Sequence, residues 1–149
     1  MWFQLVLHNG LVVVNLIIVF KFFLIGELDK ALVSLEEELD AVWETWHKPV
    51  ILTEFGADTL AGMHGHPNVM WTEEYQAECI RGHLRVAAEK DYIAGMQVWS
   101  FANFAAVQSI MRVGGLNMKG VFTRGRTPKM AAHVLREFWT QYARHSTNA

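Results

Sequence analysis

A carboxylate at the end of a largely apolar segment is the most informative feature of this sequence. The segment Pro49–Thr53 is rich in β-branched residues, which predicts a strand buried on both faces. Glu54 follows it, and Gly56 lets the backbone turn. Burying an unpaired carboxylate is costly, whereas the carboxyl ends of strands in (β/α) barrels hold reacting groups toward substrate. Glu54 is therefore a candidate catalytic residue; the alternative is a buried carboxylate paired with backbone or an arginine.

The other residues that could do chemistry narrow the candidate reactions. His64 and His66 form a His-x-His pair with no third ligand nearby in sequence, so we expect no metal site. Cys79 is the only cysteine, which excludes an intramolecular disulfide and a Cys-built zinc site. There is no Gly-x-Ser-x-Gly elbow, P-loop or dinucleotide fingerprint. We therefore expect no cofactor.

The composition allows one modest core and gives no electrostatic case for nucleic acid. The chain has 149 residues, of which 52% are hydrophobic and 19% charged, and its formal net charge is -2. Proteins that bind nucleic acid usually carry a basic patch, and the sequence has no basic stripe interleaved with aromatic residues. Nucleic acid is therefore not an expected partner.

Residues 1–26 form an atypical apolar N-terminal segment, and Leu11–Ile25 is almost wholly apolar. As a helix this stretch would be about 22 Å long, which is shorter than the roughly 30 Å hydrocarbon layer. A membrane anchor, a buried strand with a hairpin turn at residues 8–10, and a non-native start all remain open. A cytoplasmic location is favoured, with membrane association through residues 11–25 as the alternative.

Hydrophobic periodicity predicts a helix, a strand and a second helix. Apolar residues recur at three- and four-residue steps from Glu27 to Trp46, which predicts an amphipathic helix whose acidic residues, including Asp40, face solvent. The strand that ends at Glu54 comes next, followed by a loop over residues 56–69. Thr72 is the predicted N-cap of a helix that extends to Lys90.

The rest of the chain repeats this alternation. Met96–Phe101 is predicted as a second buried strand, residues 105–126 as a long loop, and Thr127 and Pro128 as the start of a last helix to Tyr142. Helices that alternate with strands imply parallel strands joined by helical crossovers. A closed barrel of this kind takes about 250 residues. The predicted fold is therefore α/β, an incomplete (β/α)8 TIM barrel with its last two to three β/α units.

Five sequence blocks resemble the C-terminal part of the catalytic barrel of family 2 glycoside hydrolases, most closely the β-glucuronidases. The blocks are Lys48–Gly62 (KPVILTEFGADTLAG), Met70–Gln76 (MWTEEYQ), Gln97–Phe104 (QVWSFANF), Arg112–Arg126 (RVGGLNMKGVFTRGR) and Pro128–Ala132 (PKMAA). Their order and spacing together make the resemblance specific. It implies that residues 27–149 are the C-terminal part of a TIM-barrel catalytic domain.

The resemblance implies a retaining glycosidase in which Glu54 is the nucleophile. Retention needs an ionised carboxylate near the anomeric carbon and a second carboxyl about 5 Å away that protonates the leaving oxygen. In the family this acid/base is the Glu of an Asn-Glu pair, and the chain contains no Asn-Glu dipeptide. The chain by itself is therefore expected to be inactive.

The resemblance also implies a set of sugar-binding residues. Asn117 and Lys119 would bind the C6 carboxylate of a β-glucuronide, Trp99 would floor the sugar pocket, and Arg112 would orient the substrate loop or the uronate. From the residues alone, the alternatives are a glycine-rich turn with a solvated lysine, a tryptophan packed in the core and a surface arginine. Leu116 makes the loop one residue longer than the family pattern.

The expected partner is a β-glucuronide or related glycoside, and the family leaves a homo-oligomer open. Two other functions remain as alternatives. One is a related hydrolase of β-galactosidase or β-mannosidase type, against which the Asn-x-Lys pair argues. The other is a non-catalytic, truncated remnant that is tethered to a membrane through its apolar N-terminal segment.

Overall fold

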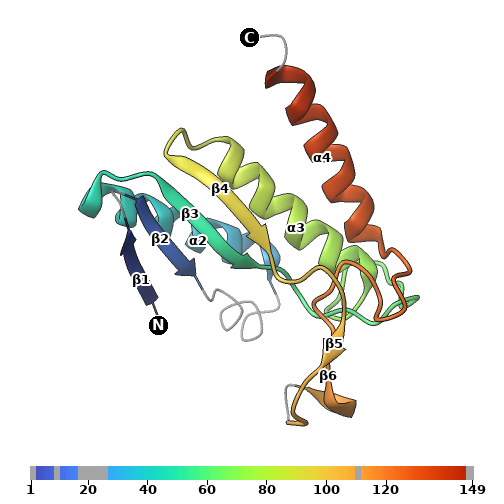
Figure 1. Ribbon diagram of the computed structural model, residues 1–149. Helices are drawn as coiled ribbons and strands as arrows, with labels where there is room; N and C mark the ends of the chain where they lie inside the picture. Colours follow the sequence, from blue (N-terminus) through green and yellow to red (C-terminus); the bar gives the residue numbers. More distant parts are fainter. Residues whose placement is uncertain (1–2, 9–10, 17–26, 110–111, 147–149) are drawn as a thin grey trace. The chain divides into compact units, whose positions relative to one another are not determined.

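The computed structural model describes residues 3–8, 11–16, 27–109 and 112–146 (Figure 1). The chain divides into two compact units. The first consists of Met1–Gly56 and Gly82–Trp99, and the second of Ala57–Arg81 and Ser100–Ala149.

The first unit is built on a four-stranded sheet. Its strands are β1 (Phe3–His8), β2 (Leu11–Leu16), β3 (Val50–Phe55) and β4 (Ile93–Val98), in the order β1-β2-β3-β4. β1 and β2 are antiparallel, whereas β2, β3 and β4 are parallel. Of the alternatives left open for the N-terminal segment, the antiparallel pairing of β1 and β2 fits the hairpin. The sheet is mixed rather than wholly parallel. Residues 9–10 and 17–26 lie outside the described part of the chain.

In the described part of the chain, no helix has the length and apolar character needed to cross a membrane. The segment proposed as an anchor, residues 11–25, is described only up to Leu16, which is strand.

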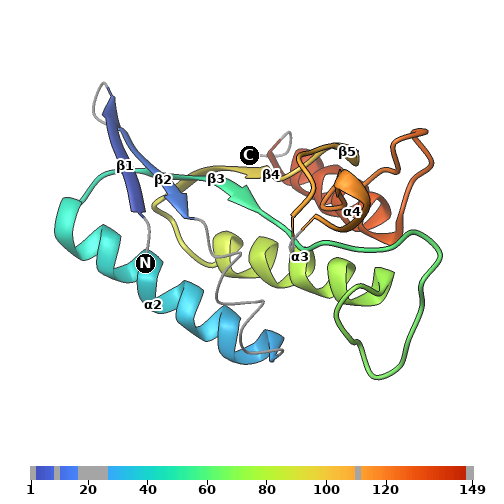
Figure 2. The same ribbon diagram turned by 90° about the horizontal axis from the view of Figure 1, so that it is seen from below.

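The helix α2 (Leu28–Trp46) confirms the amphipathic helix predicted from periodicity. Its apolar side chains on one stripe are buried: Ala31, Leu32, Leu35, Leu39 and Val42. The helix ends at His47, which adopts a left-handed conformation and donates its N–H to the Trp43 carbonyl at 2.8 Å. Figure 2 shows α2 and the C-terminal half of α3 on the same face of the sheet.

One acidic residue of α2 is not simply solvated as predicted. Asp40 Oδ1 accepts hydrogen bonds from Lys90 Nζ and Tyr92 Oη, both at 2.6 Å. The Tyr92 ring also stacks on Trp43, with centroids 5.0 Å apart. The Lys90 hydrogen bond lowers the pKa of Asp40 below its ordinary value. Asp40 therefore ties α2 to the turn that precedes β4.

The helix α3 (Glu73–Ala88) begins as predicted, with Thr72 as its N-cap. Thr72 Oγ1 accepts the N–H of Tyr75 at 3.2 Å. Gly82 lies in the middle of this helix, where glycine is usually unfavourable. A Cβ at Gly82 would lie 2.8 Å from Leu32 Cδ2, so the glycine lets α3 approach α2 closely.

The strand β4 differs from the prediction, because it begins at Ile93 rather than Met96 and ends at Val98 rather than Phe101. Its ladder with β3 starts where Val50 faces Ile93, and Gly95 faces Ile51. The apolar pattern continues past Val98, which is why sequence periodicity placed the strand too far along the chain.

The second unit contains a short hairpin that the sequence did not predict. It consists of β5 (Phe104–Ala105) and β6 (Leu116–Asn117), which are antiparallel, with a short 3₁₀ helix at Val113–Gly115 just before β6. Leu116, the residue extra to the family pattern, is paired with Ala105. Apart from Phe104, these elements fall within residues 105–126, which were predicted as a long loop.

The last helix, α4, spans Met130–Ser146 and so begins later than Thr127. Thr127 instead closes a turn in which Thr123 N–H donates to its carbonyl at 2.8 Å. The first amide of α4, that of Met130, donates to Glu73 Oε2 at 2.7 Å. Because a carboxylate from α3 caps α4, the cap could not be found from residues adjacent in sequence.

Gly120 lies where two backbone segments of the second unit approach closely. Val121 N–H donates to Ser100 O at 3.0 Å, and Asn103 N–H donates to Phe122 O at 3.0 Å. A Cβ at Gly120 would lie 2.6 Å from Ala102 Cα. Backbone cannot yield as a flexible side chain can, so only glycine fits here.

We expect Gly120→Ala to lower the free energy of unfolding by about 3 kcal/mol. Urea denaturation of the chain, followed by circular dichroism, measures this loss. Gly62→Ala is the matched control, because Gly62 also belongs to the second unit, has φ +78°, and a Cβ added there would meet nothing within 4 Å. The control should cost about 1 kcal/mol. Equal losses in the two variants would contradict the close approach at Gly120.

Candidate active site

Glu54 lies at the carboxyl end of β3. The contacts of the next residue, Phe55, indicate the face of the sheet from which the Glu54 side chain projects. Phe55 stacks on His83 of α3, with ring centroids 5.1 Å apart. Because successive side chains of a strand point to opposite faces, Glu54 projects from the face away from α3. Its carboxylate makes no hydrogen bond or ion pair with any residue that the structure describes.

An irregularity in the sheet sets this orientation. The register between β3 and β4 shifts between Leu52 and Phe55, and both of these side chains are buried. Strict alternation from Leu52 would have placed Glu54 on the buried, helix-covered face. Three residues of β3 then span two of β4, so that Phe55 rather than Glu54 lies on the buried face.

Trp99 lies beside the end of β3. Trp99 directly follows Val98, the last residue of β4. Its backbone N–H donates to Phe55 O at 2.9 Å. Gly56 has φ +142°, and a Cβ there would lie 2.7 Å from the Trp99 carbonyl oxygen. The side chain of Trp99 is 39% exposed, so it is not a fully packed core residue. The first unit thus brings Glu54 and Trp99 to the same edge of the sheet.

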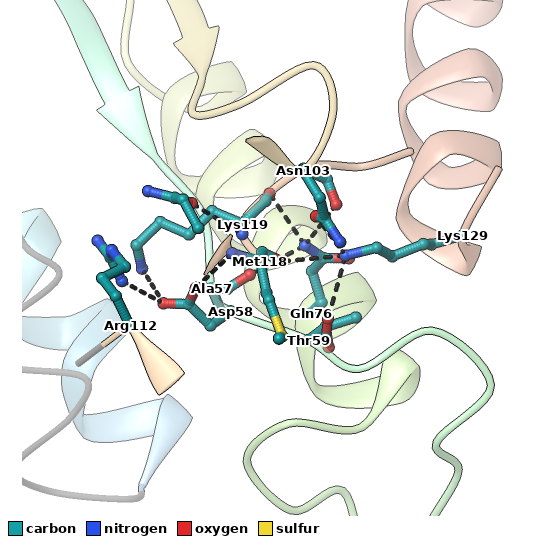
Figure 3. A network of polar contacts seen from close by, with 11 residues as sticks. Ala57, Asp58, Thr59, Gln76, Asn103, Arg112, Met118, Lys119 and Lys129 are labelled. Carbon is teal, nitrogen blue, oxygen red and sulfur yellow. Dashed lines mark hydrogen bonds and ion pairs between the residues drawn. The ribbon is translucent and has the colours of Figure 1, made fainter. Parts of the chain in front are cut away.

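The other predicted residues, Arg112, Asn117 and Lys119, lie in the second unit. Figure 3 shows Arg112 and Lys119 beside the carboxylate of Asp58. Asp58 is 5% exposed. Its Oδ2 lies 2.9 Å from Lys119 Nζ and 3.4 Å from Arg112 Nη1, and its Oδ1 accepts the N–H of Met118 at 3.0 Å. Asp58, Arg112 and Lys119 therefore form one charged cluster, with two cations and one anion.

Asn117 and Lys119 are both buried, which corrects the alternative of a solvated lysine. Their exposed fractions are 4% and 2%. Asn117 Oδ1 accepts the backbone N–H of Lys119 at 3.1 Å, so the side chain of the first residue shapes the backbone of the second. The pair sits in a defined conformation rather than in a loose glycine-rich turn.

Two further buried polar residues support the backbone around this cluster. Gln76 Nε2 donates to Ala57 O at 2.9 Å and to Lys119 O at 3.1 Å. Lys129 Nζ donates to Met118 O at 3.0 Å. The carbonyls of Ala57 and Lys119 are thus held from α3, and that of Met118 is held by the residue directly before α4.

Glu73 and Glu74 have structural partners. Glu73 Oε1 accepts the N–H of Gly62 at 2.7 Å, and its other oxygen caps α4. Glu74 Oε1 lies 2.8 Å from His64 Nδ1. Both carboxylates are therefore engaged in contacts within the second unit. Among the described residues, no group of three or more His, Cys, Asp or Glu side chains could hold a metal ion.

The family described as "Glycosyl hydrolases family 2, TIM barrel domain" matches residues 5–144. The chain belongs to this family. The match begins within the N-terminal segment that composition sets apart, and it covers almost the whole chain. Membership agrees with the α/β content and with the parallel β2-β3-β4 arrangement.

Two curated relatives of this chain are β-glucuronidases. The chain is 47% identical over 114 residues to the β-glucuronidase of Paenibacillus borealis, covering 76% of the chain and 19% of that protein. It is 41% identical over 117 residues to the human β-glucuronidase, covering 76% and 18%. The chain therefore spans about a fifth of the length of these relatives.

Solved structures of the family agree. The β-D-glucuronidase of Dictyoglomus thermophilum superposes with a TM-score of 0.75 at 47% identity, covering 78% of this chain and 20% of that one. The Bifidobacterium dentium β-glucuronidase, complexed with coumarin-3-O-glucuronide, has a TM-score of 0.75 at 46% identity, covering 80% and 19%. The fold of the family 2 chain is thus close to that of known β-glucuronidases.

Sequence reasoning missed three buried polar residues that the structure places in the network: Asp58, Gln76 and Lys129. All three lie inside the sequence blocks that carry the family resemblance. Each of these polar residues has no role assigned by the resemblance, although it lies within a block that carries it. That combination was the one sequence signal that could have indicated a buried polar contact. Their partners could not be found, because most of them are distant in sequence.

Replacing Asp58 by Asn should strongly destabilise the second unit. The change leaves the buried Lys119 ammonium without its carboxylate, and breaking a buried ion pair costs about 3 kcal/mol. Urea denaturation measures the loss. Glu78→Gln is the matched control, because it breaks an exposed Arg81 pair of little energetic value. If both changes lower the free energy of unfolding by a similar, small amount, Asp58 is not the buried ion-pair partner of Lys119.

Proposed function

We propose that this chain supplies the nucleophile and the uronate-binding residues of a retaining β-glucuronidase. The observation that carries the proposal is the position of Glu54, a carboxylate at the end of β3 on the face away from α3, in a chain of glycosyl hydrolase family 2. The names of the curated relatives supply the substrate class.

The proposed chemistry is a double displacement. The Glu54 carboxylate attacks the anomeric carbon, forming an ester bond as the bond to the aglycone oxygen breaks. An acid/base carboxyl from outside this chain protonates that oxygen. The same group then takes a proton from water, which attacks the anomeric carbon and releases Glu54 as a carboxylate. Each of the two displacements inverts the configuration at the anomeric carbon, so the product keeps the configuration of the substrate.

The charged cluster of the second unit supports recognition of a uronate. Arg112 and Lys119 carry two positive charges and Asp58 one negative charge, so the three side chains carry a net positive charge. A sugar carboxylate would neutralise it and accept charge-assisted hydrogen bonds. A neutral hydroxymethyl group would not. Asn117 would add an amide to this site.

Trp99 is proposed to contact the sugar ring. Its side chain is partly exposed at the edge of the sheet where Glu54 also lies. The apolar face of a pyranose packs well on an aromatic ring. Residues 27–149 are proposed to belong to the catalytic barrel, and the family match also includes residues 5–26.

A complete enzyme is needed to test these roles, because the acid/base is not in this sequence. It can be made from the Paenibacillus borealis β-glucuronidase by replacing the segment that matches this chain with the chain's own residues; we call it the chimeric enzyme. It should hydrolyse an aryl β-glucuronide and prefer it to the matching galactoside. The chain by itself should not hydrolyse either substrate.

Two results would contradict the proposal. One is a folded chimeric enzyme that hydrolyses no glucuronide. The other is turnover of an aryl glucuronide by the purified 149-residue chain that Glu54→Gln abolishes, since the chain would then need no external acid/base.

A further inference from the structure

Lys129 is a buried lysine that joins three separate segments of the second unit. Its side chain is 1% exposed. Figure 3 shows it reaching from the start of α4 into the network, where Nζ donates to Thr59 O at 3.2 Å, Asn103 Oδ1 at 3.1 Å and Met118 O at 3.0 Å. An ammonium group has three donors, and all three are used.

The three acceptors are neutral, which is unusual for a buried cation. Buried charges are normally paired with an opposite charge. Burial lowers the pKa of Lys129 to about 8, and the negative charges of Glu73 and Asp58 oppose this shift. Tyr75 and Cys79 are also buried in the second unit, and burial raises their pKa values to about 12, so both stay protonated where Lys129 titrates.

The Lys129 ammonium contacts the uronate-binding segment at its centre. Met118 lies between Asn117 and Lys119, and its carbonyl oxygen accepts from Lys129. The N–H of the same residue donates to Asp58 Oδ1 at 3.0 Å. Met118 is therefore held from both sides of its peptide backbone, and its position determines where the two flanking side chains begin.

We propose that Lys129 is a positioning residue, whose ammonium group holds Met118 and thereby presents Asn117 and Lys119 to the substrate. Its role in substrate recognition rests on the proposed function, whereas its hydrogen bond to Met118 does not. Loss of the Lys129 proton replaces one donor by a lone pair, which repels the third acceptor. The segment at residues 117–120 should consequently change conformation above neutral pH.

The hydrogen bond between Lys129 and Met118 can be tested directly in the 149-residue chain by following a pH titration. We expect the backbone amide resonances of Met118 and Lys119 to shift between pH 6.5 and 9.5 with a midpoint at about 8. Asn103→Asp places a carboxylate beside Nζ and should raise this midpoint by about one pH unit. Lys129→Met should abolish the titration, and Lys30→Met, at an exposed lysine, should not change it.

Two outcomes of this titration would overturn the proposal. One is the absence of a transition in the unmodified chain, and the other is a midpoint that Asn103→Asp leaves unchanged. If Lys129→Met fails to fold, the Asn103→Asp variant still tests the proposal. This variant keeps Lys129 and every side chain that contacts Asp58.

The chimeric enzyme tests the consequence for recognition. Its ratio of kcat/KM for an aryl glucuronide to that for the matching galactoside should fall about tenfold across the same transition. Asn103→Asp should move this fall to higher pH. A ratio that stays constant while the Met118 amide titrates would refute the positioning role. A chimeric enzyme without glucuronidase activity would count against the proposed function, and the amide titration would still decide whether Lys129 holds Met118.

Discussion

Replacing Glu54 by Gln in the chimeric enzyme is expected to lower kcat for an aryl β-glucuronide by about 10⁵-fold. An amide oxygen cannot form the ester with the anomeric carbon, and it cannot stabilise the positive charge that develops on the sugar. The change is nearly isosteric. Because the Glu54 carboxylate makes no hydrogen bond or ion pair with the described residues, the folded structure should tolerate the replacement.

Steady-state hydrolysis at saturating substrate measures this loss. Glu78→Gln provides the matched control, because Glu78 is an exposed glutamate of α3 whose described partner is Arg81. It should leave kcat unchanged. Retention of more than a tenth of the activity by the Glu54 variant would rule out this carboxylate as the nucleophile.

Replacing Lys119 by Ala should change which sugar the chimeric enzyme prefers. We expect the ratio of kcat/KM for the glucuronide to that for the galactoside to fall about 10³-fold. The glucuronide loses a charge-assisted contact with its C6 carboxylate. In addition, the cluster with Asp58 and Arg112 loses one cation and is no longer net positive, so it no longer favours an anion.

The ratio is the right quantity, because Lys119→Ala also leaves Asp58 with one fewer partner and should reduce the folded fraction. Two substrates measured on the same preparation share that fraction, so it cancels. Lys30→Ala, at a lysine whose side chain is 69% exposed, should leave the ratio unchanged. An unchanged ratio in the Lys119 variant would refute its role in uronate recognition, whatever happens to the total activity.

The elements around Glu54 could be predicted from sequence because their signals are local. The apolar stripe of α2 and the Thr72 cap of α3 each depend on residues within a few positions of one another. The strand that ends near Glu54 is marked by β-branched residues, and β3 spans Val50–Phe55. Local periodicity and capping were sufficient for these elements.

The face that Glu54 occupies could not be predicted from the same signals. It depends on the register shift between Leu52 and Phe55, which is a property of the pairing with β4. Alternation alone would have put Glu54 beside Leu52 on the buried face. A one-residue irregularity reverses the direction of every following side chain, and the single strand sequence does not reveal it.

The buried polar network was also beyond sequence reasoning, for a different reason. Lys129 and Thr59 are 70 positions apart, and Gln76 and Lys119 are 43 apart. No local pattern distinguishes a buried lysine with three acceptors from a solvated one. The network explains why a lysine directly before the last helix affects residues of the substrate loop.

Mass spectrometry of a trapped intermediate tests the central claim most directly. In a 2-deoxy-2-fluoro-β-glucuronosyl fluoride, the anomeric fluoride is a good leaving group, so the ester with the nucleophile forms readily. The fluorine at C2 slows hydrolysis of this ester, which therefore accumulates. After digestion of the chimeric enzyme, the account predicts one fluoroglucuronosyl group on the peptide that contains Glu54, and none in the Glu54→Gln variant. The same group on a different carboxylate of an active chimeric enzyme would contradict it.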